Sequence, residues 1–412
     1  RYTGRASPRR ASALLGNQFT ILQPGWPTRL QIMSDASHTA ITYIEVDLDA
    51  IAHNVRTLKE FIGPSVELFA VIKANAYGHG LVPVAQTVLK HGVSRLAVGR
   101  LGEGLELRQA GITAPVLALC YLMPGELRVA VECDLVPAVG EMESALVVSE
   151  LGAARRKPVP VHVKIDTGMG RYGVMPDEAV AFFNQIATLP GLVVEGIFTH
   201  FASAEARDKT FTREQFQIFQ DVLAELSAAG HPMPLLHAAN SAAALDLPET
   251  HLGAVRSGLA LYGLYPSNEV SHALPLKPAL TLKSHVASVR QLPAGASISY
   301  GRTFITPRPM PVALVPIGYG DGYHRLLSNR GAVLVNGCRA PMVGRVCMDQ
   351  SMLNLGPETD VQEGDTVVLI GRSGDEEITC DEWAEKLHTI TNEVTCQINA
   401  RVARVYDPYT GS

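Results

Sequence analysis

The sequence has few cysteines, and none has the spacing of a metal or redox motif. Its 412 residues include Cys120, Cys133, Cys338, Cys347, Cys380 and Cys396. No two of them form a CxxC pair, and no Cys/His cluster has zinc-ligand spacing. Sparse cysteines in a chain of this length are typical of a protein in the reducing cytoplasm, with mostly buried thiols. We therefore expect a cytoplasmic protein without disulfides or a metal site.

Long apolar runs and an excess of one charge sign are also missing. No run reaches about 18 apolar residues, so a membrane-spanning helix is not expected. The net charge of −5 is small for this length and gives no reason to expect nucleic acid or an acidic membrane surface as partner. The hydrophobic share of 47% is enough for packed cores, and the length suits two domains.

The first 32 residues contain no acidic residue and no continuous apolar segment. They carry five arginines among several glycines, prolines and serines. A secretory signal needs an apolar core, which this segment lacks. We expect residues 1–32 to be a disordered leader or upstream sequence outside the functional protein.

Between residues 66 and 260, short apolar runs alternate with stretches of helical periodicity. The runs are Leu68–Ile72, Leu96–Val98, Val116–Leu119, Leu135–Val139, Val161–Ile165, Val193–Phe198, Leu235–Leu236 and Ala254–Val255. Strands that alternate with helices indicate a parallel sheet with right-handed crossovers. Eight such units favour an α/β fold of the (β/α)8 TIM-barrel type; an open doubly wound sheet is the alternative on pattern alone.

Two helical stretches have predictable starts. The first begins after Asp47 and places one apolar face on Leu48, Ile51, Val55, Leu58 and Ile62. The second covers Thr212–Ser227, where Thr212 and Gln215 have the spacing of a capping box.

After about residue 275, apolar runs are separated by Gly, Pro and Asn turns, with one helix pattern at 381–388. The runs are Leu280–Val289, Val312–Ile317, Ala332–Val335 and Thr366–Ile370. This pattern is typical of a β domain. We predict a barrel domain over 33–275, whose first strand could join the other domain, and a mainly β C-terminal domain over 276–412.

Polar residues follow several of the barrel strands. Lys73 ends the first run, and alone it could be a lysine whose stem packs at the barrel rim. Later runs are followed by Lys164, Asp166, His200, His237, Asn240, Ser241, Arg256 and Gly258. Because reactive groups in TIM barrels lie at the carboxyl ends of the strands, these side chains should meet at one mouth.

Barrel enzymes often bind a phosphate with the loops after the seventh and eighth strands. The Ser241 hydroxyl and the amides of Gly258 and Leu259 suit that role. A lysine able to form a Schiff base opposite a phosphate site indicates pyridoxal 5'-phosphate. The residues alone therefore predict a barrel enzyme with a reactive lysine and a phosphate-bearing ligand.

Eight ordered segments resemble the motifs of the alanine racemase family. They are AVIKANAYGHG, KIDTGMGRYG, FTHFASA, HAANSA, VRSGLALYG, ISYGRTF, GYGDGY and GRVCMD. The resemblance covers about residues 42–405. It implies a pyridoxal-phosphate-dependent isomerase that makes D-alanine, for the cell wall or for catabolism. It also implies a homodimer whose active sites are shared between subunits.

By this resemblance, Lys73 would hold the cofactor covalently and then act as one acid/base, and Tyr300 of the partner subunit would be the other. Racemisation removes a proton from one face of a carbon and returns one to the opposite face, so two groups must flank the substrate. Burial lowers the pKa of a lysine, and nearby cations lower that of a tyrosine. Both effects would make these two residues usable bases.

The resemblance places Arg256 at the pyridine nitrogen of the cofactor and His200 between Arg256 and the partner's Tyr300. A guanidinium practically never gives up its proton, so the ring nitrogen would stay unprotonated. That state favours return of the proton to the α-carbon over transamination. This argument favours a racemase over other pyridoxal-phosphate enzymes.

Substrate binding is assigned by resemblance to Arg171 and to the backbone of Met348. Lys164, a residue often carbamylated in this family, would orient Arg171. Tyr77, Ser241, Gly258 and Leu259 would hold the phosphate, with Asn240 among the cofactor-binding residues. Tyr319 and Asp349 would line the entrance from the partner's side; Tyr319 could also be a buried aromatic in a glycine-rich turn.

One position departs from the family pattern. Where the family usually has a tyrosine in a TINYEV-like motif, this chain has TITNEV, with Asn392 at that place. The smaller amide would leave polar room beside the substrate, so we expect serine to be racemised alongside alanine. Neutral drift at this position is the other interpretation.

Other functions stay open at this point. A serine or broader-specificity racemase would share the same motifs. A barrel-plus-β-domain decarboxylase generally places an acid at the pyridine nitrogen, which Arg256 contradicts. A non-catalytic pyridoxal-phosphate-binding protein would be a lone barrel, and the β-rich region around ISYGRTF argues against it.

Overall fold

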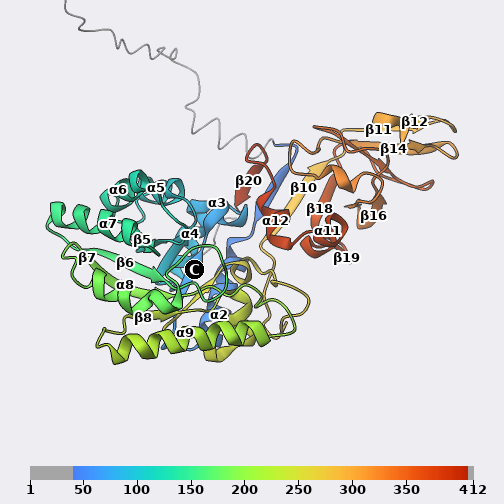
Figure 1. Cartoon of the computed structure of the whole chain (residues 1–412). Coiled ribbons are helices and arrows are strands. Elements are labelled where there is room, and N and C mark those ends of the chain that lie inside the picture. The colour runs from blue at the N-terminus through green and yellow to red at the C-terminus, as the bar shows by residue number, and fades with distance from the viewer. Residues whose placement is uncertain (1–39, 407–412) are drawn as a thin grey trace, which may run out of the picture. The chain divides into compact units, whose positions relative to one another are not determined.

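The computed structural model describes residues 40–406, and a barrel of parallel strands runs from Glu67 to Ser257 (Figure 1). Residues 1–32, expected to be a leader, lie outside the described residues. Eight parallel strands follow one another in the order β8-β7-β6-β5-β4-β3-β2-β9. They are β2 (Glu67–Val71), β3 (Arg95–Val98), β4 (Val116–Ala118), β5 (Val136–Val139), β6 (Val159–Lys164), β7 (Leu192–Phe198), β8 (Leu235–His237) and β9 (Ala254–Ser257).

Backbone hydrogen bonds close this sheet between β8 and β9. The Gly253 amide donates to the Leu236 carbonyl at 3.0 Å, and the Arg256 amide donates to the Ala239 carbonyl at 3.0 Å. The predicted TIM barrel is therefore confirmed, and the open doubly wound alternative is wrong. Each predicted apolar run coincides with one barrel strand.

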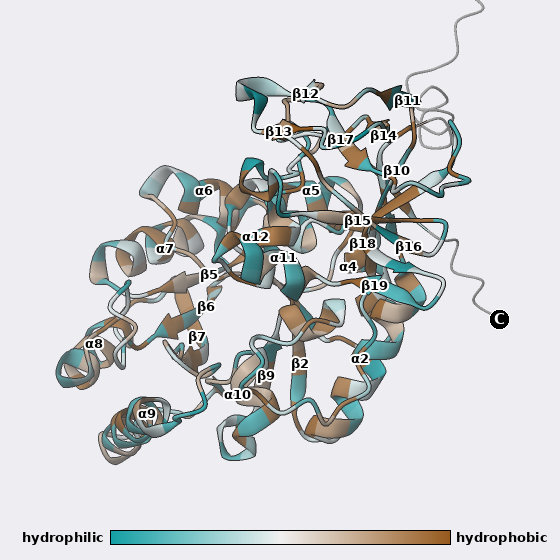
Figure 2. Cartoon of the chain, turned by 90° about the vertical axis from the view of Figure 1, so that its right-hand side faces the viewer, coloured by the Kyte–Doolittle hydropathy of each residue, from teal (hydrophilic) through white to brown (hydrophobic). Residues whose placement is uncertain are grey.

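Helices follow the strands and cover the outside of the barrel. They are α2 (Leu48–Ile62), α4 (Leu81–Lys90), α5 (Leu101–Gln109), α6 (Pro124–Glu132), α7 (Met142–Arg155), α8 (Ala179–Ile186), α9 (Thr210–Ala228) and the short α10 (Ser241–Asp246). Figure 2 shows mixed hydropathy on these outer helices and mostly hydrophobic barrel strands. Helix α2 begins as predicted, because the Asp47 carboxylate accepts a hydrogen bond from the Ala50 amide at 2.7 Å.

The predicted capping box of the later helix is wrong. Helix α9 begins at Thr210, before Thr212. The Gln215 side chain instead accepts a hydrogen bond from the Ala202 amide at 2.9 Å and donates to the His200 carbonyl at 3.3 Å. Gln215 thus braces the loop after β7, a tertiary contact that overrides the local motif.

The rest of the described chain is mainly β. A seven-stranded sheet has the order β16-β15-β18-β10-β1-β20, with β19 beside β18, and two smaller sheets are β11-β14-β17 and β12-β13. The strands are β1 (Tyr43–Val46), β10 (Leu280–His285), β11 (Ser288–Leu292), β12 (Ser297–Ile298), β13 (Phe304–Ile305), β14 (Met310–Val315), β15 (Ala332–Val335), β16 (Cys338–Pro341), β17 (Ser351–Asn354), β18 (Thr366–Ser373), β19 (Glu376–Ile378) and β20 (Ala403–Tyr406).

Strand β1 precedes the barrel in sequence but belongs to the large β sheet. It pairs antiparallel with β10 and parallel with β20 (Figure 1). Two helices lie in the β-rich part: α11 (Cys380–Leu387), close to the predicted 381–388, and α12 (Thr391–Cys396), which the sequence pattern did not reveal. Helix α12 carries Asn392 back to the barrel.

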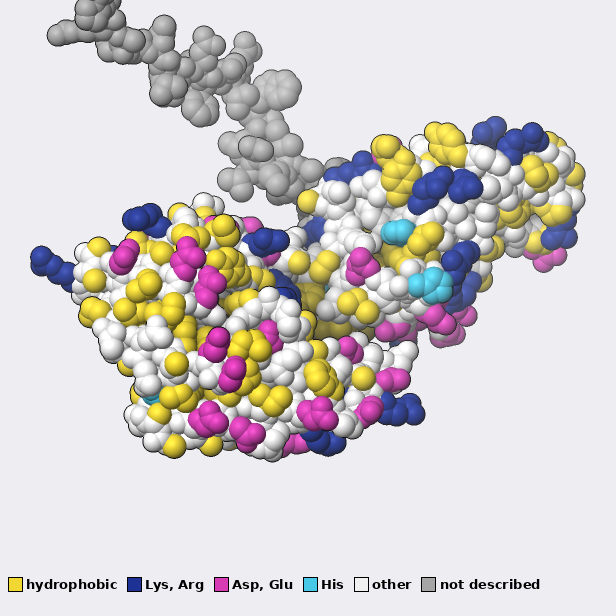
Figure 3. All heavy atoms as spheres, in the orientation of Figure 1, with side chains coloured by type: hydrophobic (Ala, Val, Ile, Leu, Met, Phe, Trp, Pro, Cys, Tyr) yellow, Lys and Arg dark blue, Asp and Glu magenta, His cyan; other side chains and the backbone are white. Residues whose placement is uncertain are grey.

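The helices could reveal membrane spans, and the surface charges could reveal charged patches. In residues 40–406, none of the helices combines the length and the apolarity needed to span a bilayer. On the face in Figure 3, acidic side chains are spread over the barrel and basic ones lie mainly at its margin and on the β-rich part. Neither sign forms one continuous patch there.

Candidate active site

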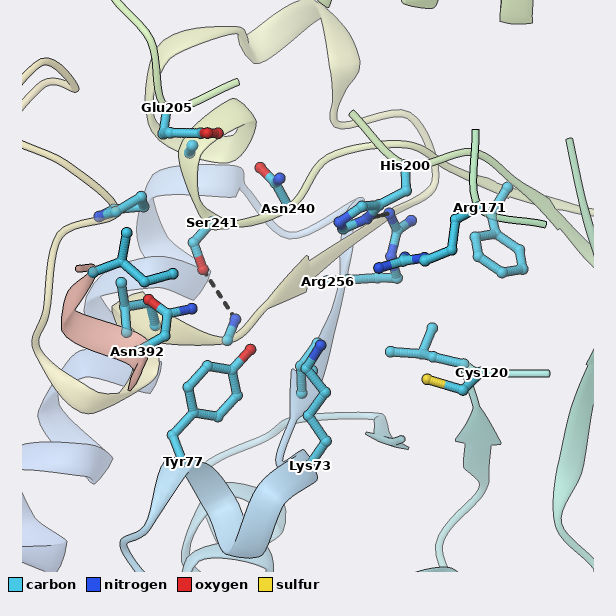
Figure 4. Close-up of a pocket in the computed structure, with 18 of the residues that line it drawn as sticks. Lys73, Tyr77, Cys120, Arg171, His200, Glu205, Asn240, Ser241, Arg256 and Asn392 are labelled. Carbon is cyan, nitrogen blue, oxygen red and sulfur yellow. Dashed lines mark hydrogen bonds between the residues drawn. The ribbon is translucent and has the colours of Figure 1, made fainter. Parts of the chain in front are cut away.

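A cavity of about 300 Å³ lies at the carboxyl ends of the barrel strands. The turn after β2 brings Lys73 and Tyr77 into it, and Figure 4 shows both side chains pointing into the same space. This turn, α3 (Lys73–Tyr77), is left-handed, because Ala74, Asn75, Ala76 and Tyr77 have φ angles between 53° and 55°. Each such residue costs about 1 kcal/mol, so the surroundings must hold the turn in place.

Side-chain hydrogen bonds hold the left-handed turn. The Asn75 carboxamide oxygen accepts from the Leu81 amide at 2.8 Å, and the Glu103 carboxylate accepts from the Ala74 amide at 2.6 Å. Below the turn, Nδ1 of the buried His79 lies 3.0 Å from the carbonyl oxygens of residues 76 and 77, so this nitrogen carries the ring proton. Burial lowers the pKa of His79 to about 4, and the ring stays neutral. Lys73 therefore projects from a braced backbone.

One end of the cavity is shaped for a small anionic group. The Ser241 hydroxyl, at the start of α10, accepts from the Gly258 amide at 2.9 Å and from the Ala260 amide at 3.4 Å. The Tyr77 hydroxyl lies against Gly258, where an added Cβ would come within 2.6 Å of its oxygen. Leu259 also lines this end. The hydroxyls of Ser241 and Tyr77, together with Gly258, which has no side chain, form a polar cradle that suits a phosphate.

The other end contains Arg256, which is only 3% exposed. Its guanidinium donates to the carbonyls of Thr199 at 2.8 Å and Ala238 at 2.9 Å, and to Nδ1 of His237 at 2.7 Å. Nδ1 of His200 lies 3.3 Å away. Among residues 40–406, no carboxylate forms an ion pair with Arg256. Burial lowers the pKa of Arg256 to about 9, so it is a buried cation at neutral pH.

Arg171 reaches the cavity from a loop that Asp166 organises. The Asp166 carboxylate accepts from the backbone amides of Gly168 and Gly170, each at 3.1 Å, and from that of Arg171 at 3.0 Å. Figure 4 shows the Arg171 side chain beside His200 and Arg256. The three cationic or imidazole groups therefore gather on one side of the cavity, where an anionic substrate group could bind.

Lys164 and Asn240 also line the cavity. The Lys164 amine donates to the Tyr172 carbonyl and lies 4.4 Å from the centre of the Tyr172 ring. Burial lowers the pKa of Lys164 to about 8. The Asn240 side chain caps α10 by accepting from the Ala243 amide at 3.0 Å, so it has a structural role whatever it binds.

Four predicted site residues lie elsewhere in the β-rich part. Tyr300 is 70% exposed, Tyr319 43% and Met348 54%, so the alternative interpretation of Tyr319 as a buried aromatic is wrong. Asp349 accepts a hydrogen bond from the Arg401 guanidinium at 2.8 Å. Within residues 40–406, none of these four lines the cavity of Lys73. The described chain thus supplies Lys73 to the cavity and leaves Tyr300 at its surface.

Sequence reasoning missed some lining residues. Glu205 and Cys120 line the cavity, and so does Ile390 beside Asn392. Glu205 lies in the loop that carries His200, and a carboxylate in a loop after a barrel strand was an available signal. Ile390 gave no signal, because nothing in a β-rich pattern shows that a later segment returns to the barrel. In the described range, no cluster of three His, Cys, Asp or Glu side chains is arranged to hold a metal.

Comparison with known proteins decides the family. The family model "Alanine racemase, N-terminal domain" matches residues 46–266, and "Alanine racemase, C-terminal domain" matches residues 279–406. The chain belongs to the alanine racemase family. This match confirms the resemblance that the eight motifs indicated. Members of the family are pyridoxal-phosphate-dependent isomerases.

Curated and solved alanine racemases cover nearly all of the described chain. The alanine racemase of Desulfosudis oleivorans is 47% identical over 374 residues, which is 88% of this chain and 96% of that protein. A structure of alanine racemase from Bacillus anthracis with bound L-Ala-P has 43% identity and a TM-score of 0.85, covering 90% of this chain and 96% of the other. A structure from Bartonella henselae with covalently bound pyridoxal phosphate has 27% identity and a TM-score of 0.81, covering 89% and 100%.

Proposed function

We propose that this chain is an alanine racemase that interconverts L- and D-alanine with pyridoxal 5'-phosphate. The observation that carries the proposal is Arg256, a buried cation without a carboxylate partner among residues 40–406, in the cavity of Lys73. A pyridine nitrogen facing this guanidinium accepts a hydrogen bond and stays unprotonated. The decarboxylases of similar fold need an acid at that place, and Arg256 does not supply one.

The cavity fits the cofactor at both ends. Tyr77, Ser241, Gly258 and Leu259 would hold its phosphate, in the cradle that a Cβ at position 258 would fill. Lys73 would hold the cofactor covalently between that cradle and Arg256. When bound, pyridoxal phosphate makes the α-hydrogen of an attached amino acid acidic by delocalising negative charge.

The protein's own groups would then move the proton. The Lys73 amine takes or gives the α-proton on one face, and Tyr300 of the partner subunit does so on the other. Nδ1 of His200 lies 3.3 Å from the Arg256 guanidinium, so the ring proton lies on Nε2 and would be donated to the phenol oxygen of the partner's Tyr300. This bond stabilises the phenolate and makes it a better base. A homodimer with shared sites is supported by the exposure of Tyr300 and by the fact that, among the described residues, it does not line the cavity of its own chain.

Arg171 would orient the substrate. Its guanidinium would bind the substrate carboxylate, with help from the backbone of the partner's Met348. Carbamylation of Lys164 would orient Arg171 by supplying an anion. The lowered pKa of Lys164 supports this, because only an unprotonated amine can take up carbon dioxide. The partner's Tyr319 and the partner's Asp349 would line the entrance.

We further propose side activity on serine. Asn392 lines the cavity, and its amide is smaller than the tyrosine that the family usually has there. The space and the polar amide could accommodate the serine hydroxyl. The D-amino acids would serve cell-wall synthesis in the cytoplasm, and the six cysteines, all free, suit that reducing compartment.

A first experiment tests the chemistry. The purified protein should absorb near about 420 nm, and borohydride should abolish the band by reducing the linkage to Lys73. In heavy water, L-alanine should become D-alanine with deuterium at the α-carbon and without release of carbon dioxide. Release of carbon dioxide would indicate a decarboxylase, and retention of both configuration and α-hydrogen would indicate a binding protein.

A second experiment tests the shared site. Lys73→Ala and Tyr300→Phe proteins should each lose racemase activity. Mixed and re-associated subunits should recover about a quarter of the wild-type rate, because half of the dimers are mixed and each has one intact site. Absence of recovery, with mixed dimers detected by mass, would contradict a site built from two subunits. Full activity of both variants would overturn the two-base mechanism.

A further inference from the structure

A line of polar side chains runs from the cavity through the barrel interior. Arg256 donates to Nδ1 of His237 at 2.7 Å, and Nε2 of His237 lies 2.7 Å from Nδ1 of His162. Nε2 of His162 lies 3.6 Å from the Glu195 carboxylate, whose other oxygen pairs with Arg95 at 2.9 Å. Arg95 is the first residue of β3, so the line ends near the amino ends of the strands, away from the cavity.

The groups at the two ends, Arg256 and Glu195, set the proton positions along this line. A guanidinium can only donate, so Nδ1 of His237 accepts and the ring proton of His237 lies on Nε2. That N–H donates to Nδ1 of His162, which leaves the His162 proton on Nε2, facing Glu195. Burial lowers the pKa of both imidazoles, so each holds one proton. The line therefore has one direction, from Arg256 to the Glu195 carboxylate.

At the Glu195 end of the line, one nitrogen of His162 and one oxygen of Glu195 can each be satisfied only by the other. Nε2 of His162 and Oε2 of Glu195 are both buried, and within the described residues neither has a hydrogen-bond partner. They face one another at 3.6 Å, so only a small approach is needed for a hydrogen bond. The His162 ring and the Arg95 guanidinium lower the pKa of Glu195 to about 2, and the carboxylate stays charged at neutral pH.

The fold makes room for these rings. At Gly196, next to Glu195 in β7, an added Cβ would come within 2.4 Å of Nδ1 of His162. The Phe198 ring stacks on the His237 ring at 4.9 Å, and the Phe69 ring lies 5.3 Å from it. Rings held in this way cannot turn to exchange their nitrogens without displacing a neighbour. Their tautomers are then fixed by the groups at the two ends of the line.

We propose that Glu195 is a positioning residue for the racemase site, acting through His162 and His237 on Arg256. The proposal rests on the proposed function only for its effect on turnover. With the carboxylate present, His162 keeps its proton on Nε2 and His237 offers a lone pair to Arg256. Without it, the protons of both rings can shift, and a protonated Nδ1 of His237 would face the guanidinium N–H. The guanidinium would then lose one of the bonds that orient it toward the cavity.

The test compares Glu195→Gln with Glu67→Gln in the holoenzyme. Glu67 pairs with Arg95 at 3.4 Å at the same end of the barrel but contacts no imidazole in the described chain, so it is a matched control. In ¹⁵N-histidine-labelled protein, wild type and Glu67→Gln should each show Nε2–H signals for both His162 and His237. Glu195→Gln should lose or shift both signals, although its amide can still bond to Arg95.

Turnover provides the second measurement. Glu195→Gln should lower kcat for L-alanine by about tenfold and change KM by less than about twofold, while Glu67→Gln changes neither. Wild-type ring signals and kcat in Glu195→Gln would overturn the proposal. Equal losses in Glu67→Gln would also overturn it, because the Arg95 ion pair alone would then explain them. If the wild-type protein does not racemise alanine, the proposed function fails. The ring signals still test whether Glu195 fixes the protons of His162 and His237.

Discussion

The Tyr77 hydroxyl lies against Gly258 so closely that a Cβ at position 258 would come within 2.6 Å of the phenol oxygen. The two residues come from the turn after β2 and from the end of β9, far apart in sequence. Gly258 has a negative φ of −117°, so it is not a left-handed glycine, and the lack of space beside Tyr77 is what disfavours a side chain here. This contact defines one wall of the phosphate cradle.

Gly258→Ala should therefore weaken cofactor binding. The methyl group must push Tyr77 aside, and overpacking of this kind costs about 1–3 kcal/mol, so we expect the dissociation constant for pyridoxal phosphate to rise by about five- to 150-fold. Absorbance titration of the apoprotein measures it. Gly125→Ala is the control, because a Cβ there meets nothing within 4 Å. If Gly258→Ala and Gly125→Ala bound pyridoxal phosphate equally well, the phosphate would not lie in this cradle.

The left-handed turn predicts an unusual stability effect. Ala74 is exposed and has a φ of 53°, so Ala74→Gly should raise the free energy of unfolding by about 1 kcal/mol. Ala224 is exposed within helix α9, and Ala224→Gly should lower that energy by about 1 kcal/mol. Urea denaturation of both variants checks the opposite signs. A loss of stability in Ala74→Gly would mean that the turn is not left-handed in solution.

The barrel could be predicted because each of its strands is marked by a short apolar run in the sequence. Each apolar run ends within two residues of a strand end. Lys73 and His200 come two residues after the ends of β2 and β7, and Arg256 lies near the end of β9. Parallel strands bring their carboxyl ends to one mouth, so these residues could be placed together without a structure. The helix α2 was likewise readable from one apolar face after Asp47.

Features that depend on distant contacts could not be predicted. Gln215 has the spacing of a cap but braces the loop of His200 instead. The left-handed turn uses Ala74 and Ala76, residues that otherwise favour right-handed helices. Tyr300 was found only through its motif, since neither periodicity nor position connects an exposed residue between β12 and β13 with a cavity in the barrel.

Lys164 should make stability depend on pH. Burial lowers the pKa of its amine from 10.5 to about 8, so between these values the unfolded chain binds one more proton than the folded chain. The contribution of Lys164 to the free energy of unfolding therefore rises with pH between these two values. The unfolding free energy of wild type minus that of Lys164→Met should increase between about pH 8 and about pH 10. Urea denaturation in buffer free of carbon dioxide measures it, and a constant difference would contradict the lowered pKa.

Asn392 should set the preference between serine and alanine. Its amide lines the cavity near Ile390, where a tyrosine would fill the space with a ring and place its hydroxyl toward the phosphate cradle. In Asn392→Tyr, the ratio of kcat/KM for serine to that for alanine should fall by about thirtyfold, since one hydrogen bond and a filled space are each worth about 1 kcal/mol. The ratio is measured by D/L analysis of both amino acids. Asn392→Gln, which keeps the amide, is the control and should change the ratio less. A ratio unchanged in Asn392→Tyr would mean that this position drifted without effect on the substrate.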